Sequence, residues 1–430
     1  MTNSFRWKAA LVILLAILVR SAFVVAVDKG LVRLEVSPDS SDLLSFGYNL
    51  ATRVGFAHSI NEDQPFSQPV EFSAWRPPLY PAVLAIAFQL SHGTLFLRSL
   101  QVVFAVSSLY LFLRLGLILF GEWPALIAGL AFALYPPLIW YSVDLGTESL
   151  FLFLLTAALF VFYAAGRERS AARVFSLGVL VGLTALCRPN GLMLAPALVI
   201  AIWLTTSDWR QAARRMILLA VAVAMVVLPW TYRNYRLFHK FVLISTNGGA
   251  TLWAGAHLRL EPGASLAEVG YSQHKAFRDV PEPDRERYYY YQAFLILDHS
   301  PRRFGEMFLS NFAAMYTLVP SAQYHSLRNR LIYSVSYIPL LVFGVVGCWL
   351  LRRRWRELSL IWGWVLTDTA LYCLFLSSIR YRIPTVDPVF MLGSGVCLAA
   401  LLERYRRASQ RVGAMPSTPS HVPLRARSSS

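Results

Sequence analysis

Residues 147–165, TESLFLFLLTAALFVFYAA, form one mostly apolar run that starts with the polar sequence Thr-Glu-Ser. A helix that crosses a bilayer needs about 20 consecutive, mostly apolar residues, so this run is long enough to span a membrane. Similar runs recur on both sides of it. We predict ten spans, near residues 8–27, 96–120, 123–142, 147–165, 172–187, 190–206, 214–231, 331–351, 357–377 and 383–403. Two shorter apolar segments, 78–91 and 304–319, are typical of interfacial or re-entrant helices.

The composition of the whole chain supports this interpretation. The chain has 430 residues, of which 56% are hydrophobic and only 15% are charged. Soluble domains average about 45–50% apolar and roughly 25% charged residues. The apolar excess excludes a single water-soluble core, a disordered chain, a collagen-like chain and a disulfide scaffold. The four cysteines lie in or beside apolar runs and indicate neither a disulfide framework nor a zinc site. We therefore predict an all-α polytopic membrane protein.

The basic residues predict how the chain is oriented. The net charge is +16, which in a membrane protein indicates basic cytoplasmic loops rather than nucleic-acid binding. With the N-terminus inside, Lys and Arg gather in the inner segments near residues 6–8, 167–173, 210–215 and 352–356, and in the tail. We therefore expect a multi-pass protein of the plasma (inner) membrane with both termini in the cytoplasm.

This orientation divides the chain into a membrane-embedded domain, residues 1–403, and a tail, residues 404–430. The large polar segments 28–95 and 232–330 then lie outside, in the periplasm, and carry interfacial helices. The tail is rich in Ser, Pro and Arg, so we expect it to be disordered and to contact the cytoplasmic membrane surface rather than nucleic acid.

Acidic residues stand out at the outer ends of the predicted spans. Asp39 and Asp42 lie in Pro38-Asp39-Ser40-Ser41-Asp42, just before a helical run over 43–51. Asp39 or Ser40 is suited to cap that helix, and a capping residue can also act as a base. Asp42 is expected to point elsewhere. Glu148 lies in the short outer turn before the fourth span, at a helix N-terminus that favours a negative charge.

Five arginines lie on the predicted outer side, although most Lys and Arg residues lie in the inner segments, and all five fall at one membrane depth: Arg76, Arg188, Arg233, Arg380 and Arg382. Each alone is typical of an interfacial anchor. Ionisable groups at such depth are costly unless they are paired or functional, and guanidinium groups match phosphate oxygens by bidentate hydrogen bonds. The set therefore favours an outer site for a lipid-linked phosphate.

The order of these motifs resembles the integral-membrane glycosyltransferases of family 39 and their relatives with the type C fold, which include protein O-mannosyltransferases and lipid A aminoarabinose transferases. The resemblance rests on Pro38-Asp39-Ser40, Arg76-Pro-Pro-Leu-Tyr-Pro81, Thr147-Glu148-Ser149, Arg188-Pro189, the stretches 229–235 and 245–249, and Arg380-Tyr-Arg-Ile-Pro384. One departure lies after the glycine pair, where relatives often have Gly-Asn and this chain has Gly255-Ala256-His257.

The resemblance implies a polyprenyl phosphate-linked sugar as donor and an inverting displacement onto an extracytoplasmic acceptor, which is a lipid A-like molecule, a glycan or a protein. Asp39 would be the general base. The donor phosphate would be bound by Arg188, Arg233, Arg380 and Arg382. Asp42, Arg76, Tyr80, Glu148 and His257 would bind substrate. No metal is demanded, although a divalent cation fits the chemistry.

Other functions remain open at this point. A flippase or transporter of lipid-linked sugars would also have many spans and an arginine-rich cavity, but transporters commonly show inverted repeats and midplane sites. A non-catalytic membrane scaffold would have no need of Asp39. A polymer ligase acting on lipid-linked glycans is a nearer alternative within the enzyme class. The clustering of polar residues at the outer ends favours chemistry at the outer face.

The orientation is testable by cysteine labelling. A cysteine introduced near Gly263 should react with an impermeant reagent in cells with a permeabilised outer membrane, because segment 232–330 is predicted to lie outside. A cysteine near Arg354 should stay unlabelled until the inner membrane is opened. The reverse pattern would overturn the orientation and, with it, the donor assignment.

Overall fold

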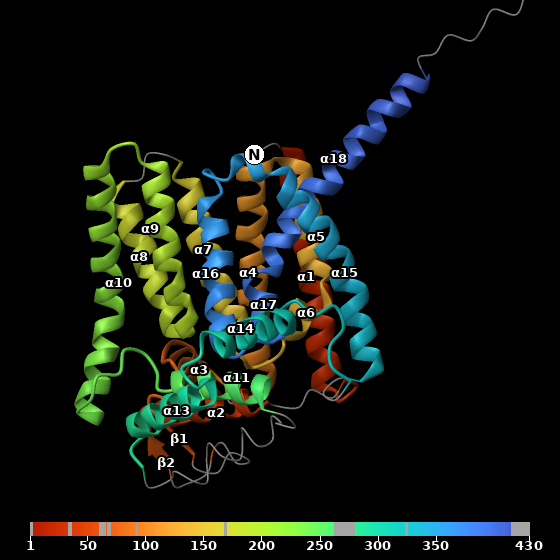
Figure 1. The fold of residues 1–430 in the computed structure, drawn as a ribbon. Helices are drawn as coiled ribbons and strands as arrows, with labels where there is room; N and C mark the ends of the chain where they lie inside the picture. Colours follow the sequence, from red (N-terminus) through yellow and green to blue (C-terminus); the bar gives the residue numbers. More distant parts are fainter. Residues whose placement is uncertain are drawn as a thin grey trace, which may run out of the picture.

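The computed structural model describes residues 3–32, 37–59, 66, 70–91, 93–166, 170–261, 280–322 and 326–413. Most of these residues form a bundle of roughly parallel helices, with smaller elements gathered at one end (Figure 1). Position 263, used above for labelling, lies outside the described residues. The predicted all-α polytopic fold is confirmed, and the strands described are two short ones.

Five described helices are long and apolar enough to cross a membrane. They are α1 (Asn3–Asp28), α4 (Thr94–Phe120), α10 (Trp209–Phe238), α15 (Leu327–Leu350) and α18 (Asp387–Gly413). Shorter helices occupy the other predicted spans: α5 (Glu122–Leu134), α7 (Glu148–Ala164), α8 (Ala171–Cys187), α9 (Leu194–Thr205) after the 3₁₀ helix η1 (Pro189–Met193), and α16 (Ser359–Leu374). The number of spans therefore stays a prediction.

Two predicted spans are interrupted. The span over 123–142 is wrong as a continuous helix, because α5 ends at Leu134 and a separate helix α6 covers Pro136–Tyr141. The adjacent prolines Pro136 and Pro137 have no N–H to continue the helical hydrogen bonds. The span over 383–403 likewise begins inside a short helix, α17 (Ile379–Thr385), and continues as α18.

The outer end of the bundle, as we call the end that carries segments 28–95 and 232–330, holds the remaining elements. The first segment forms α2 (Pro38–Ala51), the strands β1 (Ala57–Ser59) and β2 (Val70–Phe72), and α3 (Leu79–Leu90). β1 and β2 are antiparallel and pair His58 with Glu71. The second segment forms α11 (Gly248–Leu260), α13 (Glu282–Leu297) and α14 (Pro301–Met315). The expected short helices near 78–91 and 304–319 correspond to α3 and α14.

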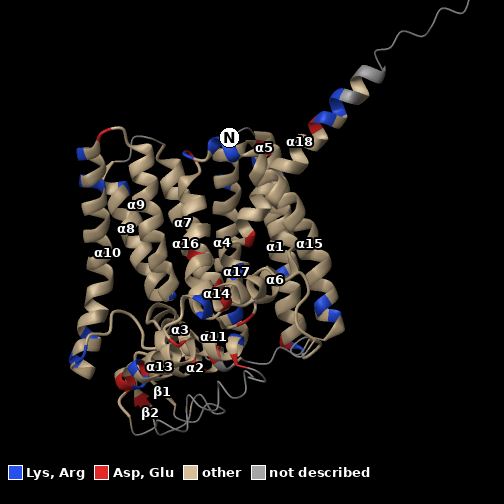
Figure 2. Ribbon diagram, viewed as in Figure 1, with Lys and Arg blue, Asp and Glu red and all other residues tan. Residues whose placement is uncertain are grey.

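The N-terminus lies at the opposite end of the bundle, where Figure 2 shows a concentration of Lys and Arg. The 3₁₀ helix η2 (Arg352–Arg354) belongs to the loop after α15. α18 continues through Gly413 and projects beyond the bundle (Figure 1). The expectation that the chain is disordered from residue 404 onward is therefore wrong for residues 404–413, which extend the helix, whereas residues 414–430 lie outside the described residues.

Small residues allow the closest helix contacts. α8 packs on α10, where a Cβ added to Gly178 would come within 2.5 Å of the Ala222 side chain. α15 packs on α18, where a Cβ on Gly347 would lie 1.8 Å from the carbonyl oxygen of Gly393. Small residues are typical of helix interfaces in membranes, where van der Waals packing replaces the hydrophobic driving force.

The α15–α18 contact predicts a matched pair of glycine variants. Gly347→Ala should lower the thermal midpoint of the detergent-solubilised protein, because the new methyl group overlaps the Gly393 carbonyl. Gly305→Ala on α14 is the control, since its new Cβ meets nothing within 4 Å and Ala favours a helix by about 0.8–1 kcal/mol over Gly. Equal midpoints for both variants would show that α15 and α18 have room for a methyl group at Gly347.

Candidate active site

The first acidic residue of the candidate site lies in the first turn of α2. Ser37 caps this helix, because its Oγ accepts the N–H of Ser40 at 3.2 Å. The expectation that Asp39 or Ser40 is the cap is therefore wrong. The hydroxyl two residues before Asp39 fills that role, and the Asp39 carboxylate is left to make other contacts.

Arg76 joins both acidic residues of α2. It lies just before α3, and its Nη2 contacts Asp39 Oδ1 at 2.6 Å and Asp42 Oδ2 at 2.8 Å. The expectation that Asp42 points away from Asp39 is wrong, because residues three apart share one face of a helix. Arg76 thus fixes the position of the α2 acids relative to the start of α3.

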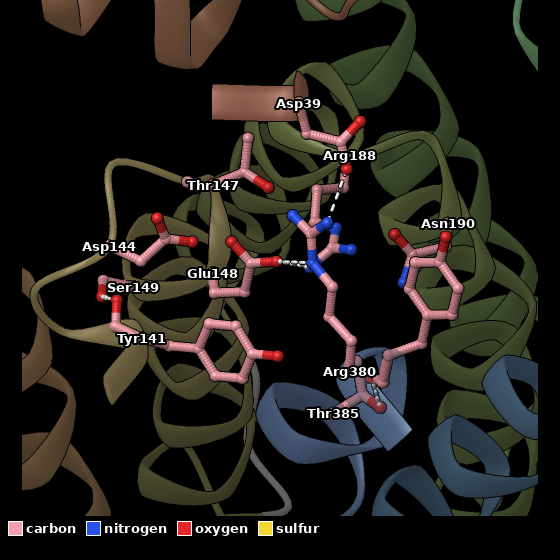
Figure 3. A network of polar contacts seen from close by, with 12 residues as sticks. Asp39, Tyr141, Asp144, Thr147, Glu148, Ser149, Arg188, Asn190, Arg380 and Thr385 are labelled. Atoms are coloured by element: carbon pink, nitrogen blue, oxygen red, sulfur yellow. Dashed lines mark hydrogen bonds and ion pairs between the residues drawn. The ribbon is translucent and has the colours of Figure 1, made fainter. Parts of the chain in front are cut away.

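Arg380 links Asp39 to the rest of the bundle (Figure 3). Its Nη1 contacts Asp39 Oδ2 at 2.5 Å, and its Nε donates to Glu148 Oε1 at 2.7 Å. Arg188, between α8 and η1, lies 3.5 Å from the same Glu148 oxygen. We call Asp39, Asp42, Arg76, Glu148, Arg188 and Arg380 the outer ion cluster.

The charges of the cluster shift the pKa of its half-buried acid, Asp39. The guanidinium of Arg76, and after it that of Arg380, holds the pKa of Asp39 well below its usual range, although burial acts in the opposite direction. Asp39 is therefore ionised at any pH near neutrality. Both of its oxygens are occupied by guanidinium groups, so in this state it is a weak base.

The turn before α7 brings a further acid, Asp144, close to Glu148 (Figure 3). Burial, and then the charge of Glu148, raises the pKa of Asp144 to about 6. Between its ordinary pKa near 4 and about 6, the folded protein binds a proton that the unfolded chain does not. Asp144 therefore lowers stability as the pH rises through this window.

Gln101 joins Tyr80 to the turn before α7. Gln101 on α4 donates through Nε2 to the Tyr80 hydroxyl at 2.5 Å and to the Gly146 carbonyl at 2.7 Å. Gly146 leaves no room for a side chain, because a Cβ there would lie 2.3 Å from Glu148 Oε2. Gln101 was not among the residues predicted from the sequence, although a lone amide inside the apolar run 96–120 was the available signal.

Several buried polar atoms of this region have no hydrogen-bond partner. They include Glu148 Oε2, Gln101 Oε1 and Arg188 Nη1. Unsatisfied buried polar atoms are uncommon in native structures, and a catalytic role or a bound group is one explanation for them. The described residues contain no group of three or more His, Cys, Asp or Glu arranged to hold a metal ion.

Besides Tyr80, three predicted site residues lie outside the cluster. Arg233 on α10 donates to the carbonyls of Ser73 at 2.9 Å and Phe56 at 3.1 Å, and its guanidinium stacks on Trp230. It therefore fastens the first outer segment to α10. His257 on α11 pairs with Glu261 and stacks on Trp253.

Arg382, the third, is fully buried in a separate ion pair. Its Nε contacts Asp387 Oδ1 at 2.7 Å, and the guanidinium also donates to the Met315 carbonyl and the Tyr333 hydroxyl. The Tyr337 ring covers one face at 3.6 Å. The hydrogen-bonding capacity of the Arg382 guanidinium is therefore largely used by contacts within the protein.

An apolar cavity of about 490 Å³ lies beside the cluster. α1, α6, α15 and α17 contribute its walls, and Arg328 and Asn329 add polar groups. Tyr141 lines the cavity and points toward Glu148 and Arg380 in Figure 3. Ile379, the residue before Arg380, also lines it. The charged cluster and the apolar cavity therefore share a wall.

Residues 75–232 match the family model described as dolichyl-phosphate-mannose-protein mannosyltransferase. This segment carries Arg76, Tyr80, Glu148, Arg188 and most of α10. No curated protein matches the chain by sequence.

The fold is similar to the oligosaccharyltransferase of Archaeoglobus fulgidus. Its apo form gives a TM-score of 0.58 at 14% identity over 95% of this chain and 52% of the other. A complex of that organism's oligosaccharyltransferase AglB with an inhibitory peptide and a dolichol-phosphate gives a TM-score of 0.58 at 15% identity, over 97% and 53%. ArnT from Cupriavidus metallidurans bound to undecaprenyl phosphate gives a TM-score of 0.44 at 15% identity, over 97% and 82%.

The chain thus spans about half the length of the oligosaccharyltransferase that it matches. The family-model match and the shared fold confirm the resemblance to type C membrane glycosyltransferases that the motif order predicted.

The Arg382 pair predicts a stability test. Arg382→Met should destabilise the protein by about 3–5 kcal/mol, because it leaves Asp387 buried and unpaired. The double variant Arg382→Met/Asp387→Leu should be less damaging than Arg382→Met alone. The stability of both variants is measured as the thermal midpoint in the same detergent. An Arg382→Met protein with the parental midpoint would show that the pair has no structural role.

Proposed function

We propose that this chain is a glycosyltransferase that moves a sugar from a polyprenyl phosphate-linked donor to an acceptor on the outer face of the inner membrane. The observation that carries the proposal is the outer ion cluster. Five stretches that are far apart in sequence, around Asp39, Arg76, Glu148, Arg188 and Arg380, supply one connected set of carboxylates and guanidinium groups. The cluster lies at the end of a membrane bundle, next to an apolar cavity.

The guanidinium groups suit the leaving phosphate. In an inverting displacement an acceptor oxygen attacks the anomeric carbon, and the sugar–phosphate bond breaks with its electron pair passing to the lipid phosphate. The anomeric carbon becomes oxocarbenium-like, as in glycoside hydrolysis. Arg188 and Arg380 are positioned to stabilise the charge that develops on the phosphate, because they are already fixed beside Glu148.

The acceptor proton would pass to Asp39. Without donor, Arg76 and Arg380 occupy both oxygens of this carboxylate. A donor phosphate would compete for the same guanidinium groups, which weakens their hold on Asp39 and raises its pKa toward a value that suits a base. Binding of the donor would thus prepare Asp39 for the acceptor.

The cavity of about 490 Å³ suits the apolar chain of such a donor. Tyr141 and Ile379 connect its wall to the cluster, so a chain in the cavity would present its phosphate near Arg380. The orphaned acceptor atoms Glu148 Oε2 and Gln101 Oε1 suit the O–H groups of a sugar or of its acceptor.

A direct assay tests this function. Purified protein is incubated with radiolabelled polyprenyl phosphate sugars and membrane extract, and the labelled product is identified. Transfer of label from the lipid to a second molecule supports the proposal. Movement of unchanged donor across vesicles without transfer would instead indicate a transporter and overturn it.

Asp39→Asn should abolish most of the activity while leaving the fold intact. Asn keeps the size of Asp but removes the base, and the helix keeps its Ser37 cap. We expect a loss of roughly 10²–10⁴-fold in transfer rate per folded molecule. Asp42→Asn is the matched control, with a smaller loss, because Asp42 is bound to Arg76 and has no contact with Arg380. An active Asp39→Asn beside an inactive Asp42→Asn would move the base to Asp42.

Arg380→Ala should reduce turnover by removing one charge-assisted donor from the phosphate, worth about 2–4 kcal/mol in the transition state. Arg380→Lys should recover only part of the rate, because a lysine cannot bridge Asp39 and Glu148 with a planar fork. Arg302→Ala on the exposed face of α14 is the control. A parental rate for Arg380→Ala would exclude it from the phosphate site.

A further inference from the structure

An arginine that the proposed reaction does not use lies within the first transmembrane helix. Arg20 of α1 is fully buried. Its Nη1 donates to the carbonyl of Ala133 at 2.9 Å, and its Nη2 donates to the carbonyl of Phe132 at 3.2 Å. A buried charge in a membrane helix is costly, and full burial excludes snorkelling toward the lipid head groups as its purpose.

The two carbonyls are those that the proline pair leaves without donors. In a continuous helix the N–H of residue 136 would bond to the oxygen of residue 132, and the N–H of residue 137 to that of residue 133. Pro136 and Pro137 have no N–H. Arg20 therefore supplies one donor to each carbonyl, from a different helix.

The break after α5 lies next to both halves of the candidate site. After α5 ends, Tyr135 adopts an extended conformation (ψ 112°) and the chain restarts as α6. α6 forms one wall of the apolar cavity and ends at Tyr141. The Tyr141 carbonyl accepts the Ser149 hydroxyl at 2.9 Å, which ties α6 to the first turn of α7, next to Glu148.

We propose that Arg20 is a positioning residue, which holds the α5–α6 break open by satisfying the Phe132 and Ala133 carbonyls and thereby sets the place of Tyr141 and Glu148. Arg20, Tyr141 and Glu148 also line one small internal cavity, so a shift at the break reaches the cluster directly. Arg20 itself contacts none of the ion-cluster residues by a hydrogen bond among the described residues.

A labelling experiment tests the position of the turn without any assay of activity. Val143 is buried against Val24 and Val27 of α1. In the Val143→Cys protein the thiol should react slowly with a maleimide, and adding Arg20→Met should speed the reaction at least about 10-fold, because the turn loosens once the two carbonyls lose their donors. Unchanged reactivity would overturn the proposal.

A double-variant comparison separates positioning from simple destabilisation. Arg20→Met should lower both the thermal midpoint and kcat, the latter by about 10–100-fold per folded molecule. In a Pro136→Ala/Pro137→Ala background the restored N–H groups can bond to Phe132 and Ala133, so adding Arg20→Met should change the midpoint little. That triple variant should still turn over slowly, because the helix can now continue through the break. An equal drop in midpoint in both backgrounds would overturn the link between Arg20 and the prolines.

Two further variants complete the test. Arg20→Lys keeps several donors on one ammonium group and should recover part of kcat, which a purely steric role would not predict. Arg114→Met is the control, since it removes from α4 an arginine that contacts the Tyr110 hydroxyl; it should keep the parental kcat. The kcat measurements rest on the proposed function, whereas the labelling and thermal-midpoint measurements do not. Failure of the proposed function can therefore be distinguished from failure of the proposal for Arg20.

Discussion

The guanidinium of Arg380 is the contact on which the outer end of the molecule depends. It reaches Asp39 on α2 and Glu148 on α7 from a short helix near the end of the chain. Asp39 is in turn joined to Arg76, and Glu148 lies beside Arg188. The alternation of charge allows these five carboxylate and guanidinium groups to lie buried or half-buried at a membrane boundary, where each alone would be costly. The outer segment 37–59 is positioned over the bundle by these ion pairs together with the backbone contacts of Arg233.

The surroundings of Arg382 and Arg380 show how a fully satisfied ion pair differs from one that leaves polar atoms without partners. Arg382 is enclosed by Asp387, two tyrosines and a carbonyl, and its hydrogen-bonding capacity is largely used. The cluster around Arg380 leaves Glu148 Oε2 and Arg188 Nη1 without hydrogen-bond partners. A pair that is already satisfied has little to gain from a ligand, whereas unsatisfied atoms in a buried, charged region gain most from one.

The helical membrane fold and the motif residues were predictable from the sequence, because span length and apolar content are local properties. Which charged residues of the site form ion pairs with each other was harder to predict. Arg380 and Arg382 are two residues apart and looked equivalent, yet one faces Asp39 and the other faces Asp387, since α17 turns them to different sides. The orientation of Asp42 was predicted wrongly. A helix that starts at Pro38 places Asp42 on the same face as Asp39. Gln101 and Arg20 were missed because each lies inside an apolar run, where its partner is distant in sequence.

The positions of the candidate site residues follow from a constraint on backbone in membranes. A transmembrane helix satisfies its own N–H and C=O groups, and irregular backbone is tolerated only where other groups replace those hydrogen bonds. This bundle has irregular backbone at the break after α5, the turn before α7 and the junction of α17 with α18. Glu148 and Arg380 project from these ends rather than from helix interiors. Each break then needs its own compensation, which Arg20 supplies for the α5 carbonyls and Gln101 for the Gly146 carbonyl. The side chains that support the breaks therefore help to set the geometry of the candidate site, together with its charged groups.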